Sequence, residues 1–323
     1  MRSIRLLLIS ALICVVCGPG QAVEGPTIAG PIGGTDIRSA VLPPPGLYAG
    51  AILGTATASD FVDGSGRTIP ALSTAHLTKT LDGPFLVYVP DVRLFGGSIG
   101  VAGIIPNGVQ CGHLFVTTPD ECTVGFADPY VEVDWSRSFG KLRPSKFPGA
   151  FPIHEGLTVL IGFGVVFPIG QYDASNPTAL ALSLGGNTWD FAPSVAFTYT
   201  TRPIFAEGTE LSAKLYWNNY LTNPATDYST GSLLNLDFAV SERIGRFQLG
   251  ITGVYVHQGE DDKQFGVKVP PDGRRVELLE LGGILNYDMP EHNAAVKVKA
   301  LDTVMAKNTV RSYLVLLALI KKF

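Results

Sequence analysis

Several stretches of seven to ten residues alternate between hydrophobic and polar side chains, with Arg137 as an exception, and this pattern limits the possible folds more than any other feature. The alternation runs through 130–139, 211–219, 233–241 and 294–300. In 211–219 the hydrophobic members are Leu211, Ala213, Leu215 and Trp217. Successive side chains of a β-strand point to opposite sides, so these stretches predict strands with one apolar and one polar face.

The N-terminus predicts export. Arg2 and Arg5 precede an apolar run of 12 residues, Leu6–Cys17. Gly20-Gln21-Ala22 then has the small-x-small form of a cleavage site. We interpret residues 1–22 as a signal peptide cleaved after Ala22. The apolar run is too short for a membrane helix, which needs about 20 residues, and no later stretch is long enough.

Charge and hydrophobicity narrow the class of protein further. Charged residues make up 16% of the chain, against roughly 25% in average soluble domains. The chain has 24 Lys and Arg against 28 Asp and Glu, and the signal peptide takes two arginines away. The mature chain is therefore acidic, which argues against a nucleic-acid partner. An exported, apolar chain without a helical span is either a soluble β protein or a membrane barrel.

Strand length favours the barrel. The predicted strands run about 10 to 14 residues, which suits a tilted membrane strand of at least about 9–11 residues. We predict an all-β fold: a single antiparallel transmembrane β-barrel of about 12 strands over residues 46–323. Long and short connections alternate, with exceptions at 141–156 and 305–309. One short turn is predicted at Leu81-Asp82-Gly83.

Both ends of the mature chain carry signals. The chain ends in Phe323 directly after the apolar run Tyr313–Ile320. A terminal aromatic on the last strand is the signal that barrel-assembly machinery reads, so we expect that partner, together with outer-membrane lipid and lipopolysaccharide. Residues 23–45 contain Pro43-Pro44-Pro45 and predict an extended periplasmic leader. Its stiffness suits a plug or a periplasmic tether.

Cys14 and Cys17 leave with the signal peptide, and Cys111 and Cys122 remain. In an oxidising compartment we expect a disulfide between them, in an outer loop spanning 105–128. The alternative is a metal site formed with His113, which would lack a fourth ligand. We therefore predict no metal site, no cofactor and no catalytic residues.

The polar faces of the strands predict the lining of the lumen. The expected lining residues are Glu132, Asp134, Lys214, Asn218, Asn235, Asp237, Gln248, Lys297, Lys299 and Arg311. Opposite charges across a narrow lumen could line a selective path, or they could form a salt-bridged block that only stabilises the barrel. A charged lumen suits hydrophobic cargo poorly.

Local motifs resemble the family of meta-pathway phenol-degradation proteins. They are FPIGQYD at 167–173, GGNTWDFAP at 185–193, LPPPGLY at 42–48, TDYSTG at 226–231 and YVHQGEDD at 255–262. The resemblance covers nearly all of 33–323. The family usually has Thr where this chain has Ile169, and the Cys111–Cys122 loop is not expected from it. The resemblance implies an outer-membrane barrel that transports hydrophobic or aromatic compounds.

Three functions follow as hypotheses. The first is a passive outer-membrane channel for small hydrophobic or aromatic solutes. The second is a structural barrel with a plugged lumen. The third is a lipid-modifying enzyme with a Ser/His pair at the outer rim, for which His257 is the candidate histidine. No Gly-x-Ser-x-Gly motif is present, so the enzyme ranks last.

Overall fold

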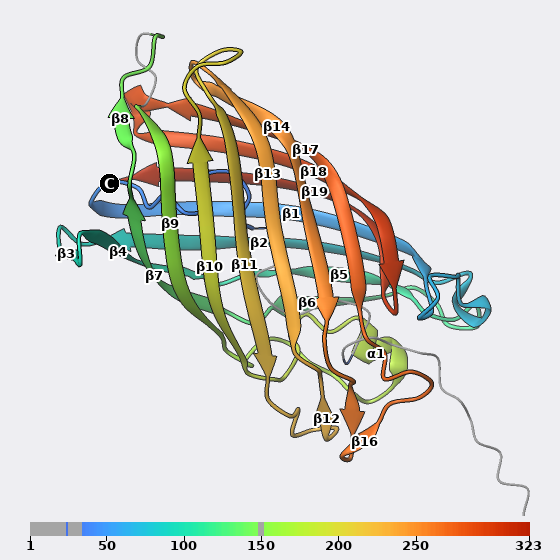
Figure 1. The fold of residues 1–323 in the computed structure, drawn as a ribbon. Coiled ribbons are helices and arrows are strands. Elements are labelled where there is room, and N and C mark those ends of the chain that lie inside the picture. Colours follow the sequence, from blue (N-terminus) through green and yellow to red (C-terminus); the bar gives the residue numbers. More distant parts are fainter. Residues whose placement is uncertain (1–23, 25–33, 148–151) are drawn as a thin grey trace, which may run out of the picture.

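The chain folds into one antiparallel β-barrel (Figure 1). The computed structural model describes residues 24, 34–147 and 152–323, so the predicted cleavage site at Ala22 lies outside the described residues. Within the described ranges, twelve barrel strands follow one another around the wall. They are β1 (Gly46–Phe61), β2 (His76–Val89), β4 (Gly97–Ile104) continued by β5 (Asn107–His113), β6 (Glu121–Phe126) continued by β7 (Tyr130–Ser138), β9 (Ile153–Val166), β10 (Asp190–Thr200), β11 (Thr209–Tyr220), β13 (Leu233–Ile244), β14 (Phe247–Gln258), β17 (Glu277–Met289), β18 (Ala294–Lys307) and β19 (Val310–Lys322).

The last strand closes the barrel on the first. β19 pairs antiparallel with β1, from Tyr48 opposite Lys322 to Phe61 opposite Val310. β1 also pairs along its length with β2, so it has a neighbour on each side. Lipid offers no hydrogen-bond partners to a backbone, and a closed sheet satisfies its backbone groups internally. The prediction of an all-β barrel of about 12 strands is confirmed.

On most of the strands apolar side chains point outward and polar side chains point inward. Large outward-facing residues with at least half of their surface exposed include Val133, Ile161, Phe163, Phe197, Trp217, Val240 and Ile251. Buried residues on the alternate positions include Glu132, Ser194, Lys214, Asp237 and Gln248. This arrangement reverses that of a soluble protein and is the one that membrane barrels adopt. The chain is therefore an outer-membrane β-barrel.

The two ends of the barrel differ. Gly46, Phe323 and the short β8 (Lys141–Arg143) and η2 (Pro290–His292) lie at one end, which we call the periplasmic end because most of its turns are short. The other end, here the extracellular end, carries the small elements of the longer loops. These are η1 (Pro70–Leu72), α1 (Pro177–Ala181), β12 (Tyr228–Ser229), β15 (Lys263–Gln264) and β16 (Val267–Lys268). Among the described residues, no helix is long and apolar enough to cross a membrane.

The turn predicted at 81–83 is wrong. Leu81, Asp82 and Gly83 lie in the middle of β2, and the chain turns instead beside β3 (Arg93–Leu94). A Cβ on Gly83 would come within 2.7 Å of the Ile105 carbonyl oxygen, at the bend where β4 continues into β5. The glycine therefore permits a close backbone approach within a strand, which is the other common reason for glycine in a strand.

Candidate functional site: the barrel lumen

A segment before the first strand fills part of the lumen, and we call residues 34–45 the plug. The backbone N–H of Thr35 donates to Asp237 at 3.0 Å, and the N–H of Ser39 donates to Ser212 at 2.9 Å. Both acceptors are inward-facing residues of the barrel wall. The leader was predicted to be periplasmic, with a plug and a tether as its two possible roles, and this part of it lies inside the barrel. Its backbone groups find partners on the polar inner wall, as buried backbone groups require.

Three ionic contacts, made by the plug residues Asp36 and Arg38, fix the plug. The Asp36 carboxylate accepts from Lys297 at 3.0 Å and from Lys299 at 2.9 Å. The Arg38 guanidinium of the plug lies 3.0 Å from the carboxylate of Asp288, which belongs to the neighbouring strand β17. Asp36 and Asp288 are both almost fully buried. Three of the charged residues that sequence analysis placed in the lumen thus serve as partners of the plug: Asp237, Lys297 and Lys299.

A second charged cluster lies on the wall itself. The ammonium of Lys214 lies 2.8 Å from Glu132 and 3.5 Å from Asp134. All three side chains are less than a tenth exposed. Ser194 also donates to Glu132 at 2.9 Å. One lysine therefore compensates two neighbouring carboxylates in a buried position, where an unpaired charge is costly.

The remaining predicted lining residues divide into two groups. Asn218 donates to Asp190 at 2.5 Å, and Gln248 accepts from Arg38 at 2.8 Å; Asn235 is also buried inside the barrel. Arg311 differs, because it is exposed and lies on the face of β19 that also presents Tyr313. Successive side chains of β19 point to opposite sides of the barrel wall, and Arg311 falls on the outward side.

Arg311 binds groups at the extracellular end instead of lining the lumen. Its guanidinium donates to the Asp60 carboxylate and, at 2.8 Å, to the Gly66 carbonyl. A long arginine side chain at a strand end can place its charge in the interfacial region while its stem crosses apolar surface. Its placement among the lumen-lining residues was wrong.

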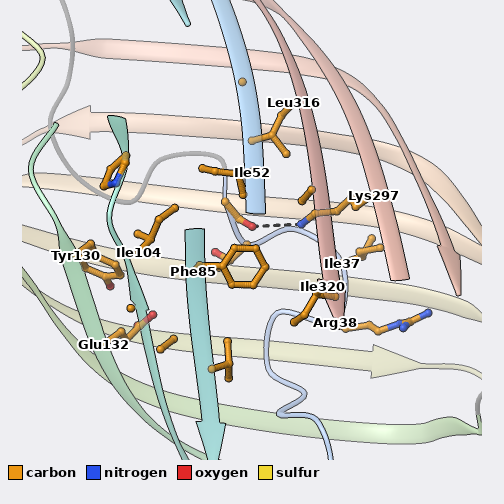
Figure 2. Close-up of a pocket in the computed structure, with 18 of the residues that line it drawn as sticks. Ile37, Arg38, Ile52, Phe85, Ile104, Tyr130, Glu132, Lys297, Leu316 and Ile320 are labelled. Carbon is orange, nitrogen blue, oxygen red and sulfur yellow. Dashed lines mark hydrogen bonds between the residues drawn. The ribbon is translucent and has the colours of Figure 1, made fainter. Parts of the chain in front are cut away.

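The plug leaves a cavity of about 1070 Å³ against the opposite wall of the barrel. This wall consists of β19, β1, β2 and β4, and we call it the apolar wall. Its cavity-lining hydrophobic side chains are Ile52, Ala56, Leu81, Phe85, Val87, Ala102, Ile104, Leu314, Leu316, Ala318 and Ile320. Figure 2 shows Ile52, Phe85, Leu316 and Ile320 pointing into this space. The plug contributes Ile37, Val41 and Leu42 from its own side.

The cavity extends along the barrel axis. Near the extracellular end it is lined by Asn223 and Tyr228, and near the periplasmic end by Asn293 and Lys322. Glu24 is also among its lining residues and accepts a hydrogen bond from Asn223. The cavity therefore reaches residues at both ends of the barrel.

Sequence analysis missed the apolar wall, although the chain carries a signal for it. Along 313–320 both alternate faces are apolar, so Leu314 and Leu316 point inward while Val315 and Leu317 point outward. From the sequence alone, Tyr313–Ile320 is interpreted only as part of the C-terminal assembly signal. Loss of alternation in a barrel strand indicates that its lumen side is apolar as well as its lipid side.

Cys111 and Cys122 form a disulfide, as predicted. The two residues lie directly opposite each other in the β5–β6 hairpin, so they belong to strands and not to an irregular loop. The thiolate–metal alternative with His113 is thereby removed. His257, the candidate for an enzymatic site, is exposed and stacks on Tyr255 with ring centroids 6.5 Å apart.

Comparisons with known proteins agree with this architecture. An outer-membrane channel from Pseudomonas putida F1 superposes with a TM-score of 0.70 at 14% identity, covering 89% of this chain and 99% of that one. The β domain of a Bordetella autotransporter has a TM-score of 0.43 at 10% identity, covering 85% and 100%. At these identities the likeness concerns the fold. No curated protein matches the sequence. The family described as "Putative MetA-pathway of phenol degradation" matches residues 58–317, and the chain belongs to this family.

Proposed function

We propose that this protein is an outer-membrane channel through which small hydrophobic or aromatic solutes pass by passive diffusion. The observation that carries the proposal is the division of the lumen. The plug covers polar wall residues such as Asp237 and Lys299, and the apolar wall lines one side of the space that remains. Charged side chains, among them Lys79 of β2, also reach this space. The charged lumen predicted from the sequence is unsuited to hydrophobic cargo. A lumen in which the plug covers charged residues and an apolar wall remains accessible can accommodate such cargo.

The cavity has the character of a small-molecule site. Such sites are mostly apolar, with a few polar groups that orient the ligand. Here Phe85 and Ile104 offer apolar surface, while Tyr130 and Glu132 add polar atoms along the same space (Figure 2). A phenol-like solute could lay its ring on the apolar wall and direct its hydroxyl to these groups.

Weak binding supports passage without an energy source. Removing roughly 100 Å² of apolar solute surface from water stabilises the bound state by about 2.5 kcal/mol. That gain favours entry over water, and it is small enough for the solute to leave again. The likeness in fold to an outer-membrane channel of Pseudomonas putida adds support.

The second candidate is a structural barrel with a blocked lumen. The buried ion pairs of Asp36 and Arg38 favour it, because they hold the plug in place. The channel would let small aromatic solutes cross the membrane, whereas the structural barrel would not.

Uptake by whole cells distinguishes them. We would measure the initial uptake of a radiolabelled small aromatic solute by cells with and without the protein, using a sugar of similar mass as the polar control. Faster uptake of the aromatic solute alone supports the channel. Equal uptake by both strains, with the barrel folded as judged by its heat-modifiable gel shift, supports the structural candidate.

A further inference from the structure

Three polar side chains form a row on the outer surface of the barrel at its extracellular end. His76 of β2 lies directly opposite His113 of β5. In the β5–β6 hairpin, Gly112 lies opposite Glu121, so the next position places Asp120 opposite His113. Residues directly opposite in antiparallel strands point to the same side of the sheet. One nitrogen or oxygen atom from each of the three side chains lies within 4.8 Å of the others.

The hydrogen bonding of His113 is unusual. Its Nε2 lies 3.0 Å from the Thr74 carbonyl oxygen, and its Nδ1 lies 2.6 Å from Oδ1 of Asp120. Both neighbours are acceptors, whereas a neutral imidazole has a single N–H to donate. His76 directs its Nε2 to the same Asp120 oxygen, at 3.4 Å. Two imidazoles thus converge on one carboxylate oxygen, an arrangement that a shared cation stabilises.

We propose that His76, His113 and Asp120 bind a late first-row divalent metal ion such as Zn²⁺. Imidazole and carboxylate are common zinc ligands, and two imidazoles select against Mg²⁺ and Ca²⁺, which prefer oxygen.

The distance between Asp120 and His76 fits such an ion, and the three ligand atoms all lie within 4.8 Å of one another. Ligand bonds of about 2.0–2.1 Å in a tetrahedron separate the ligand atoms by about 3.3 Å. The distance between Asp120 and His76 is 3.4 Å. The contact between Asp120 and His113 needs to lengthen from 2.6 Å, by roughly 0.7 Å on that geometry. Asp120 is exposed and lies immediately before β6, so a small side-chain rotation suffices.

Neighbouring groups hold the ligands in place. With Nδ1 of His113 on the metal, its Nε2–H donates to the Thr74 carbonyl, the kind of contact that orients histidine ligands in metal sites. The Cys111–Cys122 disulfide lies two residues from His113 and from Asp120 and fixes the hairpin that brings them together.

The site would link β2 to the β5–β6 hairpin at the outer rim. The side chains of His76 and Asp120 are 42% and 62% exposed, so the ion is accessible from outside. Three protein ligands leave at least one position for water or an external ligand. Sequence analysis predicted no metal site, because only the pairing of β2 with β5 brings His76 near the hairpin.

The test is a titration of the folded, disulfide-intact protein, carrying no histidine tag, with ZnCl2 by isothermal calorimetry in detergent after treatment with EDTA. We expect one saturable site per chain. His76→Gln, His113→Gln and Asp120→Asn should each weaken Zn²⁺ binding at least about tenfold, because even loss of a group that only hydrogen-bonds to a zinc ligand typically costs about 10–100-fold. His257→Gln, at the same end of the barrel, is the matched control and should bind as wild type does.

Each variant is first shown to be folded by its heat-modifiable gel shift. Asp120→Asn changes an exposed hairpin residue and provides a test even if a histidine variant does not fold. An absence of saturable binding in the wild type overturns the proposal. So does an unchanged affinity in the folded variants, equal loss in His257→Gln, or equal binding of CaCl2.

Discussion

Oδ2 of Asp36 lies 2.9 Å from the Nζ of Lys299, and both side chains are only 1% exposed. The plug is thus fastened to β18 by a fully buried ion pair. Bringing two charges out of water is costly, and the pair offsets that cost only while both members are present. The position of the plug, and with it the shape of the cavity, therefore depends on this contact.

Asp36→Asn should release the plug. The substitution removes the charged carboxylate that contacts Lys297 and Lys299. Loss of one member of a buried pair typically costs about 3–5 kcal/mol. We expect a larger single-channel conductance in planar bilayers than for the wild type. Asp63→Asn, in an exposed extracellular turn, is the control and should conduct as the wild type does. An identical conductance for Asp36→Asn would show that the ion pair does not hold the plug.

Lys214→Met should destabilise the barrel itself. It leaves Glu132 and Asp134 buried side by side without the cation that now lies 2.8 Å from Glu132. We expect the free energy of unfolding to fall by about 3–5 kcal/mol, measured by urea titration of tryptophan fluorescence in lipid vesicles. Lys321→Met, on an exposed strand end, should change it little. A similar small change in both variants would contradict the importance of the cluster.

Ile251→Arg should impair insertion into the bilayer. Ile251 is 66% exposed near the middle of β14, on the outward face. Arginine on the lipid face at mid-depth costs about 2–4 kcal/mol in membrane barrels. Refolding into vesicles, followed by the gel shift, should be reduced relative to Val116→Arg, which changes a loop residue. Equal refolding of the two variants would mean that β14 does not face lipid.

Local pattern was enough to predict the barrel and most of its faces. In 211–219 the inward set includes Lys214 and the outward set includes Trp217, as the alternation indicates. The reason is physical: in a barrel wall one side of each strand meets lipid, so the hydrophobic pattern follows the geometry of the strand directly.

A glycine in a predicted strand has two competing explanations. Gly83 reads equally well as a turn and as a close backbone approach, and only the bend at Ile105 decides between them. Arg311 was misplaced for a different reason. A charged residue at a strand end can reach the interface from the outward face, so its charge does not report the lumen side.

The placement of the plug and the proposed metal site could not be predicted from the sequence, because both depend on contacts between distant segments. The plug residue Thr35 binds Asp237, and His76 meets Asp120, through pairings that no local window contains. The apolar wall was different, since its strands lack alternation in the sequence itself. A comparison of both faces of every predicted strand would have found it.

The most direct test of the proposed channel is to fill the cavity from the apolar wall. Gly54 lines the cavity, and the nearest atom to an added Cβ is the Val315 carbonyl oxygen at 3.9 Å, so Gly54→Phe projects into open space. Gly283 is exposed on β17 with no atom within 4 Å of an added Cβ, so Gly283→Phe is a matched change outside the cavity.

We would measure the initial uptake of the radiolabelled aromatic solute by cells producing equal amounts of each folded variant. The proposal predicts that Gly54→Phe reduces uptake toward that of cells lacking the protein, while Gly283→Phe transports as the wild type does. Wild-type uptake through Gly54→Phe would show that solutes do not pass along the apolar wall.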